Sequence, residues 1–189
     1  MEAFFAAIRG HRRALDAVEA LLPKLDELAN LVESGVRAGA PIMFCGNGGS
    51  ATDADHLAGE FVGRFTRERK PFAALSLSTS PAAVTAISND YGYEQVFARQ
   101  VEAFARPGSV LLAFSTSGNS PSILRAVERA RHLNVVTAGF TAEGGGKLAE
   151  ICELHLPVGT SITARAQEMH MLLGHILCDE VERRLAETP

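Results

Sequence analysis

The sequence contains no tryptophan, and aromatic residues make up only 6% of it. It also lacks an excess of positive charge, because its formal net charge is −4 at pH 7. Proteins that bind single-stranded nucleic acid need aromatic side chains for stacking, and proteins that bind a phosphate backbone need a basic patch. The composition therefore argues against nucleic acid as a partner.

Cysteine is scarce, with three residues, Cys45, Cys152 and Cys178, and no Cys-x-x-Cys pair. An odd number of cysteines fits free thiols in a reducing compartment better than a disulfide framework. No apolar run approaches the length of about 20 residues that a membrane-spanning helix needs. The first residues also lack the basic start and apolar core of a secretory signal. We therefore expect a cytoplasmic protein that is not inserted in a membrane.

Two nucleotide-binding motifs are missing. Residues 46–51 read Gly-Asn-Gly-Gly-Ser-Ala, so the last glycine of the dinucleotide motif Gly-x-Gly-x-x-Gly is absent. A Gly-Lys-Ser or Gly-Lys-Thr sequence, which a nucleotide P-loop requires, does not occur. These absences disfavour a Rossmann oxidoreductase and a P-loop hydrolase.

The chain does contain a strand, a glycine turn and a helix in succession. Residues 41–44 are typical of the end of a buried strand, and Gly46, Gly48 and Gly49 predict a tight turn. Ser50 is the predicted cap of a helix that continues through residue 60. Glycines let the backbone approach a ligand closely, and a helix start offers free N–H groups, so this loop is a candidate binding site.

At 189 residues, the chain fits a single domain, which we expect to span residues 1–189. Short apolar segments alternate with helical patterns, which predicts an α/β fold with a five-stranded parallel sheet flanked by helices on both faces. The strands are predicted at 41–44, 73–77, 110–114, 135–140 and 154–158. The helices are predicted at 81–88, 94–105, 121–133 and 164–186, with a short one from 147 and a turn at 89–92.

Residues 1–39 precede this 40–189 core as an additional helical segment. Amphipathic patterns predict one helix over residues 2–22 and a second helix from Pro23 to about residue 39. The two helices either cover the sheet or present their apolar stripes to other subunits.

A second polar loop, residues 115–120, follows the strand at 110–114. Four hydroxyl groups lie in these six residues, and Ser120 is the predicted cap of the helix that begins at Pro121. The hydroxyl groups are Ser115, Thr116, Ser117 and Ser120. Many donors at a helix start suit a phosphate ester, although an ordinary capped helix is the alternative.

His56 and Glu60 are four residues apart, so they share one face of the helix that leaves the glycine loop. They form either a solvated pair or part of a site. Gln167, His170 and His175 in the last helix are further candidates. Gln167 and His175 are about 12 Å apart along a helix axis, so their side chains must lean together to share an ion, or one must serve a neighbouring subunit.

A basic run follows the first site helix: Arg64, Arg67, Arg69 and Lys70. We expect the last three to lie in a solvated turn, whereas Arg64 is near enough to the predicted site to contact substrate. Asn89 and Asp90 are either a turn pair or a means of recognising substrate hydroxyl groups.

Taken together, the motifs resemble the bacterial phosphoheptose isomerases of the SIS (sugar isomerase) domain family. They are the residues at 45–50, the His56 and Glu60 pair, Asn89 with Asp90, the loop at 115–120, the Gly-Gly-Lys turn at 145–147, and Gln167, Glu168, His170 and His175. The similarity extends from the N-terminal helices to about residue 185, and the joint presence of Glu60, Gln167 and His175 is its most specific part.

The resemblance implies an SIS-type three-layer sandwich and conversion of sedoheptulose 7-phosphate to D-glycero-D-manno-heptose 7-phosphate for heptose biosynthesis. Glu60 would be the catalytic base and His175 its acid/base partner, roles that suit proton transfer through an enediol. The family's zinc positions correspond to His56, Glu60, Gln167 and His175. Family members are homotetramers with sites between subunits.

The expected substrate-binding residues come from both loops and from the positions that match the family. They are Asn47, Gly48, Gly49, Ser50, Glu60, Arg64, Asn89, Asp90, Ser115, Thr116, Ser117, Ser120 and Gln167. Two alternatives remain open at this point: a non-catalytic SIS adaptor that binds the bacterial replication initiator, and a sugar-phosphate sensor. Either alternative predicts sugar-site residues without turnover.

Overall fold

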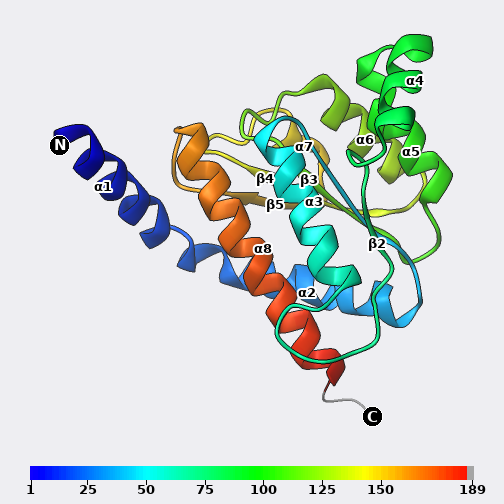
Figure 1. The fold of residues 1–189 in the computed structure, drawn as a ribbon, viewed down its shortest axis with the longest axis horizontal. Helices are drawn as coiled ribbons and strands as arrows, with labels where there is room; N and C mark the ends of the chain where they lie inside the picture. The colour runs from blue at the N-terminus through cyan, green and yellow to red at the C-terminus, as the bar shows by residue number, and fades with distance from the viewer. Residues whose placement is uncertain (187–189) are drawn as a thin grey trace.

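The computed structural model describes residues 1–186, so the last three residues of the predicted domain lie outside the described part. Its centre is a parallel sheet (Figure 1). The strand order in this sheet is β2-β1-β3-β4-β5. The strands are β1 (Ile42–Gly46), β2 (Ala74–Ser76), β3 (Val110–Phe114), β4 (Val136–Thr141) and β5 (Leu154–Pro157). The predicted five-stranded parallel sheet is confirmed.

Helices cover the sheet on both faces. They are α1 (Glu2–Asp16), α2 (Leu22–Arg37), α3 (Gly49–Val62), α4 (Pro81–Tyr91), α5 (Val96–Phe104), α6 (Pro121–His132), α7 (Leu148–Ile151) and α8 (Thr163–Ala186), with 3₁₀ turns η1 (Glu19–Leu21) and η2 (Tyr93–Gln95). Alternate strand residues face opposite layers. Phe44 and Leu112 pack with α2, α3 and α8, whereas Met43 and Leu111 pack with α5, α6 and α7. The predicted three-layer arrangement is therefore confirmed.

The predicted helix over residues 2–22 is wrong in its extent. Helix α1 ends at Asp16, and the chain passes through η1 before α2 begins. Pro23 explains the interruption, because it has no N–H to donate to the Glu19 carbonyl and its ring would crowd that carbonyl in a continuous helix. Val18 and Leu21 in the intervening segment are buried in the core.

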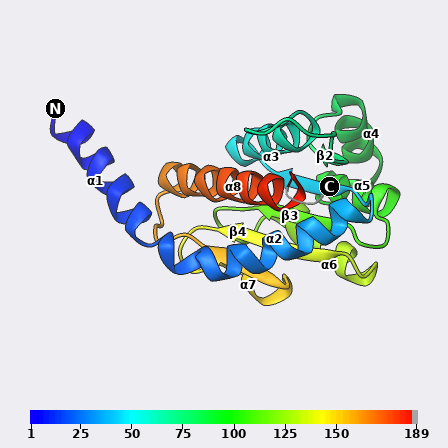
Figure 2. The same cartoon turned by 90° about the horizontal axis from the view of Figure 1, so that it is seen from below.

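Helix α1 extends away from the rest of the molecule (Figures 1 and 2). Only Gly10 and Ala14 of this helix are buried, while Phe4 is 72% exposed and Ile8 is 54% exposed. Its C-terminal half is attached to α8, where His11 Nδ1 lies 2.7 Å from a carboxylate oxygen of Glu168. The described part of the chain thus leaves an apolar stripe of α1 uncovered.

Two local predictions need correction. Ser50 does not cap α3: the helix already begins at Gly49 with Gly48 as its cap, and Ser50 is buried within the first turn. The turn predicted at residues 89–92 begins too early, since α4 continues to Tyr91 and ends at Gly92 with φ 86°. Asn and Asp suggested a turn there, but the glycine that tolerates positive φ terminates the helix.

The strand order places the two polar loops next to each other. From β1 the chain crosses to β2 on one side and then to β3 on the other, so β1 and β3 are adjacent where the winding direction reverses. Parallel α/β sheets bind ligands at such a switch point, beyond the carboxyl ends of the strands. Asn47 after β1 donates to Ser122 Oγ in α6 at 3.0 Å, which joins the two loop regions.

Helix α8 is long, but charged residues occur throughout its sequence. None of the described helices combines the length and the hydropathy needed to cross a bilayer.

Candidate active site

The glycine loop after β1 has a backbone that other residues would strain. Gly48 has φ 56° and ψ −125°, a region that L-residues with a side chain rarely occupy. At Gly49, an added Cβ would lie 2.6 Å from Gln167 Nε2, so α8 approaches the backbone of the loop directly. The glycines thus serve both the turn and the contact with α8, and they leave the start of α3 without a side-chain cap.

The loop at 115–120 gathers its hydroxyl groups at the start of α6. Ser115 is buried, and its Oγ donates to Ser120 Oγ at 3.2 Å. Ser120 is at the capping position but makes no side-chain hydrogen bond to the helix. Ser117 Oγ accepts the backbone N–H of Asn119 at 3.2 Å. The loop therefore places hydroxyl groups beside the N–H groups of a helix start, as the predicted phosphate site requires.

His56 and Glu60 of α3 meet His175 of α8. His56 Nε2 lies 3.2 Å from a carboxylate oxygen of Glu60 and 3.1 Å from Nε2 of His175. One ligand atom from each of the three residues can be chosen so that all lie within 4.8 Å of one another. Residues 115 or more positions apart in the sequence therefore converge on one point within a single chain.

The surroundings of His175 favour its neutral imidazole. Burial lowers the pKa of His175, the charge of His56 lowers it further, and the Glu60 carboxylate partly opposes the two effects. Neutral imidazole nitrogens and a carboxylate oxygen are the ligand types that zinc prefers. Three such atoms converging on one point, with ring nitrogens facing each other, fit a divalent metal ion by the chemistry of the donor set.

Gln167 lies farther along the seam between α3 and α8. Its Nε2 is 3.5 Å from Ser50 Oγ and its side chain packs on Gly49, at the opposite end of α3 from Glu60. Gln167 thus borders the glycine loop, where a substrate group is expected. Its membership of the metal ligand set stays a prediction.

Four further candidate residues lie apart from the His56, Glu60 and His175 group in this chain. His170 is fully buried and packs between Phe114 and Phe140, with ring centroids 5.9 and 6.1 Å away. Arg64 is exposed and pairs with Glu68 at 3.6 Å. Asn89 Nδ2 donates to Asp90 Oδ1 at 2.8 Å on the exposed end of α4, so the two residues belong to a helix and not to the predicted turn.

The prediction that Arg67, Arg69 and Lys70 form a solvated turn is correct only for Lys70, which is exposed. Arg67 forms an ion pair with Asp179, and the Arg69 side chain is only 8% exposed. Their partners lie in α8, more than 100 residues away in the sequence. A local charge pattern cannot reveal such contacts.

Sequence reasoning missed three residues near the site. Phe65 stacks on the His175 ring, with centroids 5.3 Å apart and planes 27° apart. Tyr93 donates its hydroxyl to Asn47 Oδ1 at 2.7 Å, directly on the glycine loop. Burial raises the pKa of Asp53 to about 6, although the nearby charge of His56 opposes the shift. Only Asp53 carried a sequence signal, since it lies three residues before His56 on α3.

The hollows in the surface agree only partly with this location. A hollow of about 260 Å³ lies beside the glycine loop, between α3 and the end of β2. A larger one of about 520 Å³ is lined by residues of α4, η2, α5 and α6 and contains none of the predicted site residues. The convergence of ligand groups, and not the size of a hollow, therefore marks the candidate site.

Comparison with known proteins agrees with this geometry. The sequence profile of the SIS domain matches residues 4–142. The chain belongs to the SIS domain family. It is 49% identical to the phosphoheptose isomerase of Rhodospirillum rubrum over 86% of this chain and 87% of that protein.

Two solved structures extend the similarity to the whole fold. Phosphoheptose isomerase GmhA from Neisseria gonorrhoeae superposes with a TM-score of 0.90 and 38% identity, covering 96% of this chain and 98% of the other. A phosphoheptose isomerase from Francisella tularensis gives a TM-score of 0.88 and 32% identity, with coverages of 96% and 95%. Within the SIS domain family, this chain is therefore an isomerase of the phosphoheptose isomerase group.

Proposed function

We propose that this SIS-family protein converts sedoheptulose 7-phosphate to D-glycero-D-manno-heptose 7-phosphate through an enediol, as a step in heptose biosynthesis. The observation that carries the proposal is the convergence of Glu60 from α3 and His175 from α8 beside two loops suited to a sugar phosphate. The names of relatives that share nearly half of its residues support the same reaction.

Aldose–ketose isomerisation moves a proton between adjacent carbons and another between the oxygens they carry. The Glu60 carboxylate is the proposed base that removes the proton from one carbon and returns it to the next. The His175 imidazole is the proposed group that moves protons on the oxygens. Burial favours its neutral form, which can accept a proton at one nitrogen and donate from the other.

The remaining predicted residues would bind and orient the sugar. Phosphate is expected at the 115–120 loop, where Ser115 and Ser120 already hold each other's hydroxyl groups in place. The hydroxyl groups of the sugar chain would meet the glycine loop. There, Asn47 is fixed on two sides by Tyr93 and Ser122. A held phosphate and a held chain place the reacting carbons against Glu60, and such orientation is a large part of catalysis.

Zinc is the proposed metal, held by His56, Glu60 and His175, with Gln167 as the fourth ligand by family resemblance. When bound, it would orient or polarise the carbonyl of the open-chain sugar. A carboxylate or imidazole that ligates a metal is a weaker base, so metal binding and proton transfer compete at Glu60 and His175.

We also propose that the protein is a cytoplasmic homotetramer whose sites lie at subunit interfaces. The exposed apolar stripe of α1 supports this, because such a surface is expected to pack against another subunit. Replacing Phe4 and Ile8 together by Glu should give smaller particles in sedimentation velocity. An unchanged sedimentation coefficient would contradict a role of α1 in assembly.

The function is tested by incubating the purified protein with sedoheptulose 7-phosphate and observing the aldose product by NMR. Wild type should form the heptose, and Glu60→Gln or His175→Ala should lower kcat by about 10²- to 10⁴-fold, the usual contribution of an acid/base group. Glu68→Gln, a change of an exposed carboxylate in the following loop, is the matched control. A wild-type protein that binds the sugar phosphate without turnover, with zinc present, would contradict the proposal and favour the sensor.

A further inference from the structure

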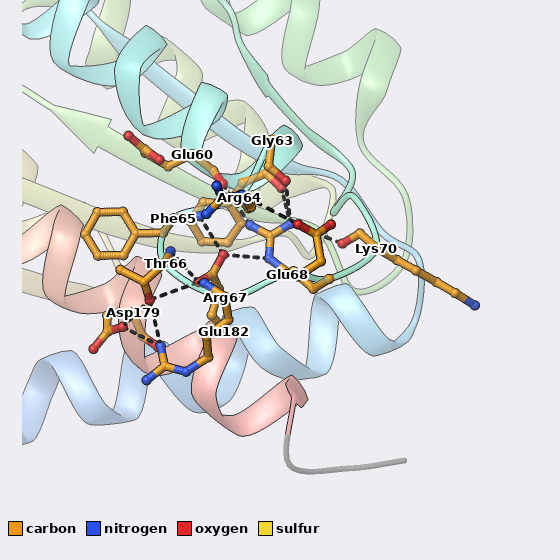
Figure 3. Close-up of polar contacts among 12 residues, drawn as sticks. Glu60, Gly63, Arg64, Phe65, Thr66, Arg67, Glu68, Lys70, Asp179 and Glu182 are labelled. Carbon is orange, nitrogen blue, oxygen red and sulfur yellow. Dashed lines mark hydrogen bonds and ion pairs between the residues drawn. The ribbon is translucent and has the colours of Figure 1, made fainter.

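The loop that follows α3, residues 63–70, folds back on the C-terminal part of α8 (Figure 3). Glu182 of α8 is only 1% exposed and lies under this loop. Its carboxylate accepts three consecutive backbone N–H groups, from Phe65 at 2.6 Å and from Thr66 and Arg67 at 2.9 Å each. A carboxylate surrounded by consecutive N–H groups fixes the path of the backbone around it.

Arg69 completes this arrangement from the other side. Its Nε donates to Glu182 at 2.9 Å, and its guanidinium group lies 3.7 Å from the centre of the Phe72 ring. The remaining nitrogens donate to carbonyl groups where α3 ends, those of Glu60 at 2.8 Å, Phe61 at 2.9 Å and Gly63 at 3.2 Å. Carbonyl groups at a helix end lack partners within the helix, so Arg69 serves as the C-terminal cap of α3.

Both residues are connected to the candidate active site. Arg69 holds the backbone carbonyl of Glu60, the proposed base. Glu182 holds the backbone N–H of Phe65, whose ring stacks on the imidazole of His175. One buried ion pair therefore fixes the α3 backbone at Glu60 and the Phe65 ring that stacks on His175.

We propose that Arg69 and Glu182 are positioning residues of the isomerase site, which set the relative placement of the Glu60 carboxylate and the His175 imidazole. This inference rests on the proposed function for its kinetic consequence. Proton transfer between adjacent carbons requires the base within hydrogen-bonding reach of both. A displacement of about 1 Å can cost about 100-fold in rate. Neither residue has to touch the substrate to have this effect.

The same loop provides an internal control. Arg67 also pairs with a carboxylate of α8, that of Asp179, but the two side chains are 37% and 48% exposed. Its side-chain contacts are with Thr66 and Asp179, so it touches neither Glu60 nor His175. Arg67→Gln therefore removes an arginine–carboxylate pair from the same two segments without disturbing the connection to the site.

The kinetic test compares Arg69→Gln, Glu182→Gln and Arg67→Gln with wild type. The first two should lower kcat by about 10- to 100-fold and leave KM within about twofold, because the geometry of the base changes while the binding loops do not. Their double variant should lose no more than the worse single variant, since the two residues act as a unit. Arg69→Lys should be impaired like Arg69→Gln, because an ammonium group cannot reproduce the fork of hydrogen bonds.

A destabilised control separates positioning from folding. Val127 is fully buried in α6 on the opposite face of the sheet. Val127→Ala should lower the melting temperature while leaving kcat unchanged at a temperature where all variants are folded. If Arg69→Gln and Arg69→Lys also retain the kcat of Val127→Ala, the pair is merely structural and the proposal is overturned.

A spectroscopic measurement that does not depend on activity completes the test. In NMR spectra of protein with isotope-labelled histidine, the stacked Phe65 ring should change the chemical shifts of the His175 ring protons. The Phe65→Leu variant gives these chemical shifts in the absence of the ring. Arg69→Gln should shift these signals toward the Phe65→Leu values and leave His155 unchanged. Signals that stay at the wild-type values would overturn the proposal. If the wild-type protein fails to isomerise the sugar, only the proposed function is contradicted. The His175 chemical shifts still test whether Arg69 positions the Phe65 ring against His175.

Discussion

Two polar clusters lie along the same seam between α3 and α8, and they are built in opposite ways. In the open cluster, His56, Glu60 and His175 bring lone pairs toward one point, and His56 is 49% exposed. In the closed cluster, Glu182 and Arg69 are almost fully buried, and donors and acceptors alternate around them. The first arrangement calls for a cation or a substrate, whereas the second is complete in itself.

The difference shows how one pair of helices can hold a cluster open to ligands next to a cluster that is fully hydrogen-bonded. A buried charge must be paired and hydrogen-bonded to be tolerated, so the closed cluster is rigid. In the open cluster, the acceptor atoms of His56, Glu60 and His175 face each other at a partly exposed position, so they stay available to bind a cation or a substrate. The predictions below test whether stability depends on the closed cluster and ligand binding on the open one.

The largest effect on stability should come from Glu182→Ala, which leaves Arg69 and three backbone N–H groups without their acceptor in a buried place. Removing one member of a buried pair costs about 3–5 kcal/mol. The free energy of unfolding, measured by urea titration at pH 7.5, should fall by that amount. Asp179→Ala, the exposed counterpart in the same helix, should cost less than about 1 kcal/mol. Equal losses from the two changes would remove the distinction between closed and exposed pairs.

The next effect concerns ligand binding by the open cluster. Zinc that binds only the folded protein should stabilise it by about 2.7 kcal/mol at a free concentration 100 times the Kd. Thermal unfolding of chelator-treated protein with and without added zinc measures the gain. It should disappear in His175→Ala and persist in Glu182→Gln.

Gln167→Leu decides a point that the geometry of one chain leaves as a prediction. If Gln167 is the fourth ligand, the variant should bind zinc more weakly while His170→Leu binds it as wild type does. Equal zinc affinity of Gln167→Leu and wild type would confine Gln167 to the glycine loop, where its side chain packs on Gly49.

Much of this arrangement could be predicted from the sequence, because it rests on local signals. Apolar runs and the glycines between them predicted the parallel sheet and the glycine loop, and a cluster of hydroxyl groups marked the loop at 115–120. The helical spacing of His56 and Glu60 placed them on one face, and the family resemblance pointed to His175. These features depend on residues close together in the chain or on motifs held in common with relatives.

The closed cluster could not be predicted, because its contacts join residues far apart in the sequence. Arg69 and Glu182 are 113 positions apart, and each is an ordinary charged residue in its local context. The sequence suggested a solvated basic turn, but Arg69 is buried because Glu182 of α8 lies opposite it. Phe65 and Tyr93 were missed likewise, since an aromatic residue in a loop has no periodic pattern that reveals its partner.

His170 allows a further test of the comparison, because it is buried like the closed cluster but is not hydrogen-bonded as that cluster is. Neither ring nitrogen makes a hydrogen bond of ordinary geometry with the described residues. Burial lowers the pKa of His170 to about 4, and the backbone of Thr141 opposes this only in part. An unfolded histidine titrates near 6.5, so between these values the unfolded state binds more protons.

Stability should therefore fall as the pH falls from about 6.5 toward 4, by about 1.4 kcal/mol per pH unit for this group. His170→Leu should remove this contribution, so wild type should lose about 2 kcal/mol more than the variant between pH 6.5 and pH 5. Urea unfolding at the two pH values measures the difference. Contributions from the other ionisable groups are common to both proteins and cancel in the difference. Parallel pH profiles for wild type and His170→Leu would mean that His170 is protonated without cost in the fold.

The smallest effect is expected where the open cluster alone is changed. His56→Ala removes a half-exposed ring whose polar contacts are with Glu60 and His175. Since surface substitutions usually change stability by no more than about 0.5 kcal/mol, the metal-free variant should unfold almost as wild type does. The zinc-dependent gain in stability should nevertheless be lost. A large loss of stability without metal would show that the open cluster also holds α3 against α8, and the contrast between the two clusters would fail.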